Sequence, residues 1–401
     1  MKNVGIVCEY NPFHNGHKHQ IDYLRRSGAE CIICVMSGSF TQRGEPAILD
    51  KYTRAEIAVR CGADIVLELP FPYCSLSAEG FSRAGAYILD AVGADTLCFG
   101  CECGDTNALR GAAEIASSRE FQEKYASLQK DGVASTSAYF EAYEQISGKK
   151  ADFGSNALLG ISYLRAIEDL GLAVDALAIK REGSAYNDTE LGSSYPSATA
   201  VRNLIRREGA ELEDLQRLMP KEAAEALVGA TVRNTAPVFD DTLFPHLNSF
   251  FRLHTPKEIE QRAISLCGGN SILDDGDGIV HRLCASARNA TNCRDFYVAA
   301  FNSRYTNSRI KRVILYSLLG VSDTYRTALP EYTTLLAASR RGCEHLSKIR
   351  KSAKIRIVTK PADTPECVTY TLNARADSLY TLLMPKTCRG DVFYKCSPFI
   401  I

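Results

Sequence analysis

The fold of this chain is decided by the stretch Val4-Gly5-Ile6-Val7-Cys8-Glu9-Tyr10-Asn11-Pro12-Phe13-His14-Asn15-Gly16-His17. Its first part, residues 4–8, is short, continuous and apolar, which is typical of a strand buried on both faces of a parallel sheet. Beyond the loop, Ile21 and Leu24 keep helical spacing among polar residues. The stretch therefore predicts a strand, a tight loop and a helix.

The loop between this strand and helix has the chemistry of a phosphate site. Free backbone N–H groups and the positive end of a helix dipole face any ligand above the carboxyl edge of a parallel sheet. His14 and His17 add two imidazole or imidazolium donors, and Gly16 leaves room for a flat base or a ribose. The alternatives are a pair of solvated surface histidines and a metal site that includes His19.

The apolar runs of the first half alternate with helical patterns. They occur at 4–8, 31–36, 65–69 and 96–99, with a fifth at 174–179. Three runs follow a Gly-Ala-acid tripeptide, whose glycine suits the end of a preceding helix. This alternation predicts an α/β fold with a Rossmann-like parallel sheet that binds a nucleotide at the carboxyl edge of its strands.

Beyond about residue 210, helical patterns replace this rhythm. We expect a Rossmann-like ATP-binding or adenylation domain at 1–208, with a helical insertion at about 105–170. A mainly α-helical region follows at 209–401. It ends in a small terminal subdomain at about 352–401, with a short strand at 355–359 and an apolar helix at 378–384.

Length and composition are those of an ordinary folded protein of two or three domains. The chain has 401 residues, 45% hydrophobic and 23% charged, and no apolar run approaches the roughly 18 residues that a membrane span needs. The first strand is too short for a secretory signal, so we expect a cytoplasmic protein. The 15 cysteines are scattered and odd in number, which favours reduced thiols.

Several motifs resemble known families. The pattern His-x-Gly-His after a first strand resembles the HIGH-type nucleotidylyltransferases, which release pyrophosphate from a nucleoside triphosphate. Longer segments are similar to the tRNA(Met) cytidine acetate ligase family: residues 9–17, Met36-Ser37-Gly38-Ser39-Phe40-Thr41-Gln42-Arg43-Gly44-Glu45-Pro46-Ala47 and Leu67-Glu68-Leu69-Pro70. Later landmarks in the same order extend the resemblance over nearly the whole chain: Phe99-Gly100-Cys101-Glu102, Asn156-Ala157-Leu158-Leu159-Gly160, Ser197-Ala198-Thr199-Ala200-Val201-Arg202 and Arg304-Tyr305-Thr306-Asn307-Ser308-Arg309.

The resemblance implies an ATP-dependent ligase. Such an enzyme activates acetate as acetyl-adenylate and transfers the acetyl group to the wobble cytidine of elongator tRNA(Met), giving acetylcytidine. The expected cofactors and substrates are ATP, acetate and Mg2+, and the expected partner is the tRNA, with no membrane. The oligomeric state is left open.

The resemblance also implies two sets of site residues. The catalytic set is His14, His17 and Lys51. The ATP-binding set is Val7, Cys8, Glu9, Tyr10, Asn11, Pro12, Phe13, His14, Asn15, Gly16, His17, Lys18, His19, Gln20, Gly100, Asn156, Arg181, Ser197 and Arg202. The family commonly has Ser where this chain has Cys101, and often a second Asn where it has Ala157.

Some of these residues also have structural interpretations. Lys51 and Arg54 stand at a helix start, where they would either close over the β- and γ-phosphates or lie on a solvated face. Ser197 is a good N-cap, and with Arg202 it resembles the Ser-x-x-x-x-Arg helix start of nucleotidylyltransferases.

Two further side-chain pairs bear on catalysis and metal binding. Glu9 and Glu45 would orient groups or act as a general base for the cytidine amine. No metal site is expected, because Cys101 and Cys103 lack a second Cys or His cluster at ligand spacing.

The net charge of zero hides an asymmetry between the two parts of the chain. Residues 251–401 contain 23 Lys and Arg against 13 Asp and Glu, whereas residues 1–250 contain 24 against 34. A basic run at 340–360 lies in the positive part and is either an RNA contact or a solvated face. We expect tRNA to bind here and at another helix start, through Arg304, Tyr305, Arg309, Arg312, Lys348, Arg350, Lys351 and Lys354.

Two other functions compete with the ligase. A nucleotidylyltransferase that acts on a small phosphorylated cofactor precursor would share the loop, but it would leave the basic C-terminal part unexplained. A non-catalytic RNA-binding protein would not need the histidines, Ser197 or Arg202 to be intact.

Overall fold

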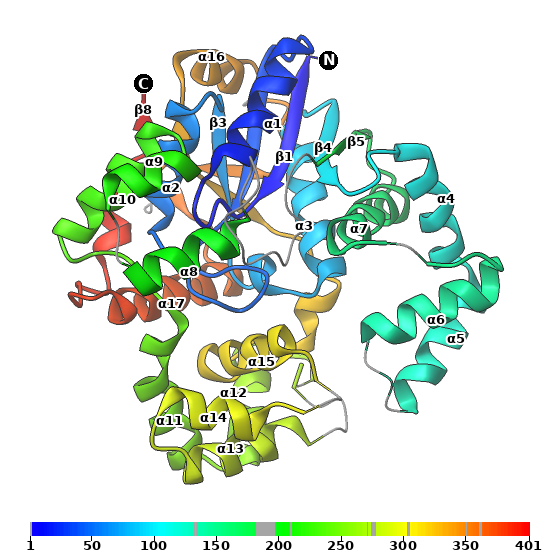
Figure 1. Cartoon of the computed structure of the whole chain (residues 1–401), viewed down its shortest axis with the longest axis vertical. Helices are drawn as coiled ribbons and strands as arrows, with labels where there is room; N and C mark the ends of the chain where they lie inside the picture. Colours follow the sequence, from blue (N-terminus) through cyan, green and yellow to red (C-terminus); the bar gives the residue numbers. More distant parts are fainter. Residues whose placement is uncertain are drawn as a thin grey trace.

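In the computed structural model, the described part of the chain forms one eight-stranded sheet with helices on both faces (Figure 1). This part comprises residues 2–131, 133, 135–151, 153–181, 197–208, 211–270, 272–273, 278–302, 305–349, 351–360 and 363–401. None of the described helices is both long and apolar enough to cross a membrane.

The first half of the chain supplies five parallel strands in the order β5-β4-β1-β2-β3. They are β1 (Asn3–Cys8), β2 (Cys31–Ser37), β3 (Ile65–Leu69), β4 (Thr96–Cys101) and β5 (Asp175–Lys180). Both β2 and β3 are buried along their whole length, because helices cover both faces of the sheet. The predicted α/β fold with a parallel sheet is confirmed.

The last part of the chain returns to the same sheet. β6 (Tyr332–Ala338) pairs antiparallel with β3, and β7 (Arg356–Val358) and β8 (Phe399–Ile400) pair parallel with β6. The sequence pattern predicted a strand near β7 but missed β6 and β8. The segment 352–401 thus contributes β7 and β8 to the main sheet, and its expected status as a small terminal subdomain stays a prediction. The division at residue 208 stays a prediction, and the sheet crosses it.

Two layers of helices bury the two faces of the sheet. One core joins alternate residues of β2 and β3 to α3 (Ala78–Ala91) and α7 (Ser155–Leu170). The other joins the remaining residues to α1 (Asn15–Arg26), α2 (Lys51–Arg60) and α8 (Ala198–Glu208). The glycines of the three tripeptides end their helices as predicted, with φ of 88° at Gly28, 109° at Gly62 and 78° at Gly93.

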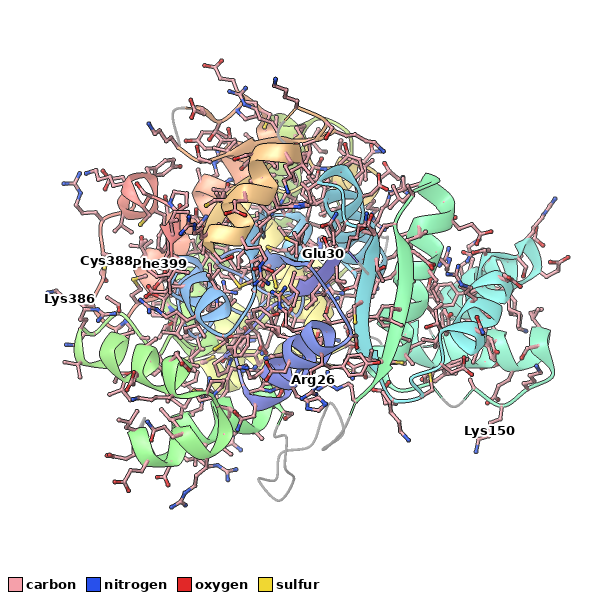
Figure 2. All side chains as sticks on the ribbon, turned by 90° about the horizontal axis from the view of Figure 1, so that it is seen from above. Arg26, Glu30, Lys150, Lys386, Cys388 and Phe399 are labelled. Carbon is pink, nitrogen blue, oxygen red and sulfur yellow. The ribbon has the colours of Figure 1, made fainter. Side chains whose placement is uncertain are left out.

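The other helices extend the fold around this sheet. Seen from the end where β1 begins, Lys150 and Lys386 mark opposite sides of the molecule (Figure 2). The helices are α4 (Thr106–Ser117), α5 (Arg119–Lys130), α6 (Ser135–Ser147), α9 (Leu212–Leu218), α10 (Lys221–Val232), α11 (Phe244–Leu253), α12 (Pro256–Cys267), α13 (Ile279–Asn289), α14 (Cys293–Ala300), α15 (Asn307–Leu319), α16 (Arg340–Ile349) and α17 (Val368–Leu383).

The strand order reverses at β1. The chain places β2 and β3 on one side of β1 and β4 and β5 on the other. In open α/β sheets, ligands bind outside the carboxyl ends of the strands at such a reversal. The loops that follow β1 and β4 therefore frame the candidate site.

Candidate active site

His14 and His17 are fixed at the start of α1 by backbone hydrogen bonds. His14 is the N-cap residue, and its Nδ1 accepts from the Gly16 N–H at 3.1 Å. The His14 N–H in turn donates to Nδ1 of His17 at 3.3 Å. Because each Nδ1 accepts, each ring carries its proton on Nε2. Both histidines therefore present an Nε2–H donor.

These two imidazoles are neutral near pH 7. Burial lowers the pKa of His14 to about 3, with further lowering by the positive charges of Arg181 and Arg202. Burial also lowers the pKa of His17 well below its ordinary value, followed by the effects of His14 and Arg181. Of the two donor forms that the sequence left open, the structure favours neutral imidazole over imidazolium.

Aromatic packing holds the loop between β1 and α1, residues 9–14. The ring of Tyr10 lies 4.7 Å from that of Phe13 and 4.9 Å from that of His17, measured between centroids. The rings of His14 and His17 stack at 3.7 Å. Tyr10 reaches this position with a φ of 46°, in the left-handed region that non-glycine residues seldom adopt. The histidine rings are thus held in place before any ligand binds.

Two arginines from later parts of the chain lie close enough to act on the histidines. Arg202, on α8, donates from Nη1 to the Asn11 carbonyl at 2.7 Å, which ties α8 to the loop. Arg181 follows β5 directly, and its Nη1 lies 3.5 Å from Oδ1 of Asn156. Together with the imidazole donors, these guanidinium groups form a set of hydrogen-bond donors suited to phosphate oxygens.

Glu102 organises the neighbouring start of α7. Its carboxylate accepts from the Asn156 N–H at 3.3 Å, from Nδ2 of Asn156 at 2.8 Å and from the Ala157 N–H at 2.9 Å. Gly154 permits this approach, because a Cβ there would lie 2.3 Å from Cδ of Glu102. The sequence motif around Gly100 contained Glu102, but no role was assigned to it. The sequence did not indicate that Glu102 lies beside the start of α7, because its partners Asn156 and Ala157 are distant in the chain.

Gly100 and Ser197 occupy positions that fit their expected neighbourhoods. A Cβ on Gly100 would lie 3.0 Å from Cγ of Arg181, so glycine leaves room for that side chain. The Ser197 hydroxyl accepts from the Ala200 N–H at 3.1 Å, which confirms the predicted N-cap of α8. Their contacts with ATP stay predictions.

Lys51 is held away from solvent by two carboxylates. Its Nζ lies 2.7 Å from Oε1 of Glu68 and 2.6 Å from Oδ2 of Asp377, and all three side chains are buried. The solvated helix face that the sequence offered as the alternative is therefore wrong. The predicted catalytic role would require the ammonium to leave both partners.

Arg54 has a structural environment of the same kind. It is fully buried, and its guanidinium donates to the carbonyls of Leu49 at 3.0 Å and Glu9 at 2.6 Å. A third bond reaches the carbonyl of Gly38. These bonds tie the β1–α1 loop to the loop between β2 and α2, residues 38–50, which we call the β2–α2 loop.

The two candidate carboxylates are both engaged. Glu9 accepts from the Gln42 N–H at 2.8 Å, and burial raises its pKa. Glu45 lies 2.6 Å from Nζ of Lys311 and 3.8 Å from Arg202. Nζ of Lys311 also lies 2.7 Å from Asp240. This arrangement supports an orienting role for Glu45 within an ion-pair network.

The remaining predicted ATP-binding residues lie on the same strand, loop and helix. Val7 and Cys8 end β1, and Asn11 accepts through Oδ1 from the Ile48 N–H at 2.7 Å. Asn15, Lys18, His19 and Gln20 belong to the first turns of α1. Lys18 pairs with Asp22 on the exposed side of that helix.

The predicted tRNA contacts near α15 are mostly packed. Tyr305 is only 5% exposed, and the Arg309 guanidinium lies over its ring at 5.3 Å, so stacking of a base there requires the ring to become accessible. Arg312 donates to a carbonyl of the β2–α2 loop at 3.3 Å. Arg304 and Arg350 lie outside the described residues.

The basic run lies at the opposite edge of the sheet. Lys348, Lys351 and Lys354 are exposed in and after α16, and Lys354 pairs at 3.1 Å with Asp90. Asp90 accepts a hydrogen bond from the Ala173 N–H, just before β5 begins. The helix α16 lies beside the end of the sheet where β1 begins (Figure 1). A strand of six residues spans about 20 Å. The structure thus separates these lysines from the histidines by the length of the sheet.

Among the residues that the structure describes, no three His, Cys, Asp or Glu side chains are grouped to hold a metal ion. Cys101 and Cys103 have their sulfur atoms 3.6 Å apart, and every described cysteine is free.

Comparisons with known proteins extend over the whole fold. The HIGH nucleotidyl transferase family model matches residues 1–392. A tRNA(Met) cytidine acetate ligase of Syntrophotalea carbinolica is 35% identical, covering 96% of this chain and 95% of that protein. One of Acetivibrio thermocellus is 32% identical, covering 90% of this chain and 89% of that protein.

Solved structures agree with these relatives. The ligand-free crystal structure of Thermotoga maritima TmcAL matches with a TM-score of 0.90 and 31% identity, covering 100% of both chains. The form bound with alpha-thio ATP matches with a TM-score of 0.87 and 30% identity, covering 100% of this chain and 99% of that one. The chain therefore belongs to the tRNA(Met) cytidine acetate ligase family, within the HIGH nucleotidyl transferases.

Proposed function

We propose that this protein is an ATP-dependent ligase that acetylates the wobble cytidine of elongator tRNA(Met). In the first step, an acetate oxygen attacks the α-phosphate of ATP, and pyrophosphate leaves to give acetyl-adenylate. In the second step, the exocyclic amine of the cytidine attacks the acetyl carbonyl, AMP leaves, and the amine gives up one proton. The name of the relatives and the ATP analogue in the Thermotoga structure support these substrates.

The observation that carries this proposal is the convergence of His14, His17, Arg181 and Arg202 at the reversal of strand order. Negative charge builds on phosphate oxygens as acetate attacks and pyrophosphate leaves. Two neutral Nε2–H donors and two guanidinium groups, already in place, stabilise that charge without having to reorganise. Removal of one such donor typically lowers the rate about a hundred- to a thousand-fold.

The second step places weaker demands on the protein. Acetyl-adenylate is already activated, so a positioned amine can attack it without a strong base. Glu9 and Glu45 are engaged by Gln42 and Lys311, which agrees with orientation as their task. The protein mainly has to hold the cytidine against the intermediate and exclude water.

The smaller partners follow from the same chemistry. Magnesium, bound to the triphosphate, would neutralise part of the phosphate charge. We assign no described residue to hold it. Acetate would bind beside the α-phosphate, within reach of Arg181 or the histidines. A protein that modifies tRNA works in the cytoplasm, so we assign it there.

The RNA contacts form a finer proposal. Residues 1–208 would carry the adenylation site, and residues 209–401 would supply most RNA contacts. Arg309 and Arg312 would serve the carboxyl edge, near the reacting base. Lys348, Lys351 and Lys354 would contact phosphates of a more distant part of the tRNA, because they lie at the other edge.

Release of pyrophosphate from ATP tests the function. We expect release to depend on acetate, and tRNA with a wobble cytidine to gain the mass of one acetyl group. A tRNA with uridine at the wobble position should gain none. Release that requires a phosphorylated cofactor precursor in place of acetate would overturn the proposal.

A further inference from the structure

A pocket lies at the carboxyl edge of the sheet, beside β3 and β6. Its floor is formed by the buried ion pairs of Lys51 with Glu68 and Asp377, and by Asn373. Asn373 donates from Nδ2 to Glu68 at 3.3 Å and accepts from the Phe71 N–H at 2.9 Å. The floor is therefore a connected set of buried hydrogen-bonding groups.

The Tyr332 hydroxyl is a buried polar group of this pocket whose hydrogen bonding is incomplete among the described residues. The Tyr332 hydroxyl is buried and makes no hydrogen bond of good geometry with any described residue, although the Asn373 amide lies near it. A buried hydroxyl without a hydrogen bond costs about 1 to 3 kcal/mol. A ligand that enters the pocket and bonds to this hydroxyl would recover that cost.

The walls of the pocket are aromatic. They are formed by Tyr52, Phe393, Tyr370 and Tyr394, which come from α2, α17 and the segment that follows it. Tyr52 and Phe393 lie 6.1 Å apart between centroids, and Tyr370 and Tyr394 also lie 6.1 Å apart, edge to face. All but Phe393 are partly exposed. A flat ring can thus reach aromatic faces from solvent.

The charges of the pocket select among ligands. Its floor carries two carboxylates against one ammonium, so a free anion such as acetate or pyrophosphate would be repelled. Lys360 lines the pocket and is exposed to solvent. Its ammonium can therefore bind a phosphate group that lies outside the pocket. Aromatic walls, mixed donors and acceptors, and a cation outside are the features by which proteins bind unstacked RNA bases.

The pocket is joined to the adenylation site through the β2–α2 loop. Ser39 donates to Asp377 at 2.6 Å at the pocket floor, and Gln42 donates to Glu9 at 2.8 Å beside the histidines. The strands β1 and β3 are separated by β2, so the two sites are about 10 Å apart across the sheet. A short single-stranded stretch of RNA can span both.

We propose that this pocket binds an unstacked nucleobase of the RNA substrate, close in sequence to the base that is acetylated. The inference rests on the proposed function for the identity of the RNA. The aromatic walls hold the base, the floor and the Tyr332 hydroxyl contact its polar edge, and Lys360 meets its phosphate.

The test measures binding of a fluorescent seven-nucleotide single-stranded RNA that contains the CAU anticodon, by anisotropy, with a non-hydrolysable ATP analogue present. Ala374→Trp fills the pocket from α17, and Tyr394→Leu removes one wall. Each should weaken binding about tenfold, since stacking of one base contributes roughly that factor or more. Tyr23→Leu removes an exposed tyrosine of α1 and should bind RNA like the wild type.

Acetate-dependent pyrophosphate release without RNA is measured on the same samples. All three variants should retain it, which also shows that they are folded. If Ala374→Trp and Tyr394→Leu release pyrophosphate and bind the RNA like the wild type, the pocket proposal is wrong. If the wild type binds RNA through the pocket but shows no acetate-dependent release, the proposed function fails and the pocket stands.

Discussion

Substitution of Glu102 by Gln tests whether the start of α7 positions Arg181, the arginine that we predict to contact ATP. The carboxylate of Glu102 accepts three N–H groups, two of them from Asn156, and Oδ1 of Asn156 lies 3.5 Å from Nη1 of Arg181. Gln keeps the shape but loses the charge and one acceptor. We expect Asn156 to reorient and Arg181 to lose its lateral support.

The size of the effect follows from these contacts. Loss of a helix-capping acceptor costs about 0.5 to 2 kcal/mol, and exposure of Glu102 places the stability cost at about 1 kcal/mol. For a chain of 401 residues this lowers Tm by only about 1 °C. Loss of one well-placed phosphate contact from Arg181 costs about 1.4 kcal/mol, which corresponds to a tenfold increase in KM for ATP.

The assay is acetate-dependent pyrophosphate release at varied ATP concentration, with thermal unfolding of the same samples. Asp105→Ala is the matched control. Asp105 caps the adjacent helix α4 by accepting from the Asn107 N–H at 2.9 Å and the Ala108 N–H at 3.1 Å. The control variant should lower Tm to the same extent as Glu102→Gln and leave the KM for ATP unchanged.

A result in which both variants lose the same stability and keep the KM for ATP of the wild type would refute the reasoning. Glu102 would then be an ordinary helix cap. An increase in KM that is confined to Glu102→Gln, with kcat changed less, supports its role as a positioning residue.

Three further predictions follow from the buried groups and the basic run. Lys51→Met should lower the free energy of unfolding by about 3 to 5 kcal/mol in urea titrations, because it leaves two buried carboxylates unpaired; normal stability with lost pyrophosphate release would restore the catalytic interpretation. Folding lowers the pKa of His14 from its ordinary value of about 6.5 to about 3. Between these two pH values the unfolded chain binds more protons than the folded chain, so the free energy of unfolding decreases as the pH is lowered. Between pH 7 and pH 5, urea titrations should therefore show about 2 kcal/mol more loss for the wild type than for His14→Asn, and equal losses would contradict the shift. The double variant Lys348→Gln, Lys351→Gln should weaken tRNA binding and flatten its salt dependence without changing pyrophosphate release in the absence of RNA; unchanged tRNA affinity would exclude α16 from the RNA-binding surface.

The first half of the fold could be predicted because its signals are local. The apolar runs that became β1 to β5 are continuous, and each is bounded by residues that end or begin a helix. The loop that holds His14 and His17 could be found in the same way, since the chemistry of a helix start follows from the few residues that form it.

The return of the chain to the sheet could not be predicted locally. β6 contains Leu335-Leu336-Ala337-Ala338, a run that also suits a helix, and β8 has only two residues. The pairing of β6 with β3 is a contact between segments more than 260 residues apart. Strand pairing at such a separation depends on the tertiary fold, so no nearby residue indicates it.

The environment of Lys51 was hidden for the same reason. The sequence shows a lysine at a helix start, where solvent or phosphate is the ordinary partner. One of its two carboxylates, Asp377, is 326 residues further along the chain and reaches it only because α17 packs beside β3. Glu102 is a similar case, since its partners are 54 and 55 residues away.

The β2–α2 loop connects the two functions that the fold combines. On one side it reaches the adenylation site, through the Gln42 N–H to Glu9 and the Gly38 carbonyl to Arg54. On the other side the C-terminal part holds it through several hydrogen bonds, among them Asp377 on α17 with Ser39, Lys311 on α15 with Glu45, and Arg312 on α15 with the Gln42 carbonyl. RNA bound as proposed at α15 or α17 would therefore act on a loop that also contacts the loop holding His14 and His17. Because the same loop is bonded to both parts, displacement of the C-terminal helices is transmitted to the loop beside the histidines.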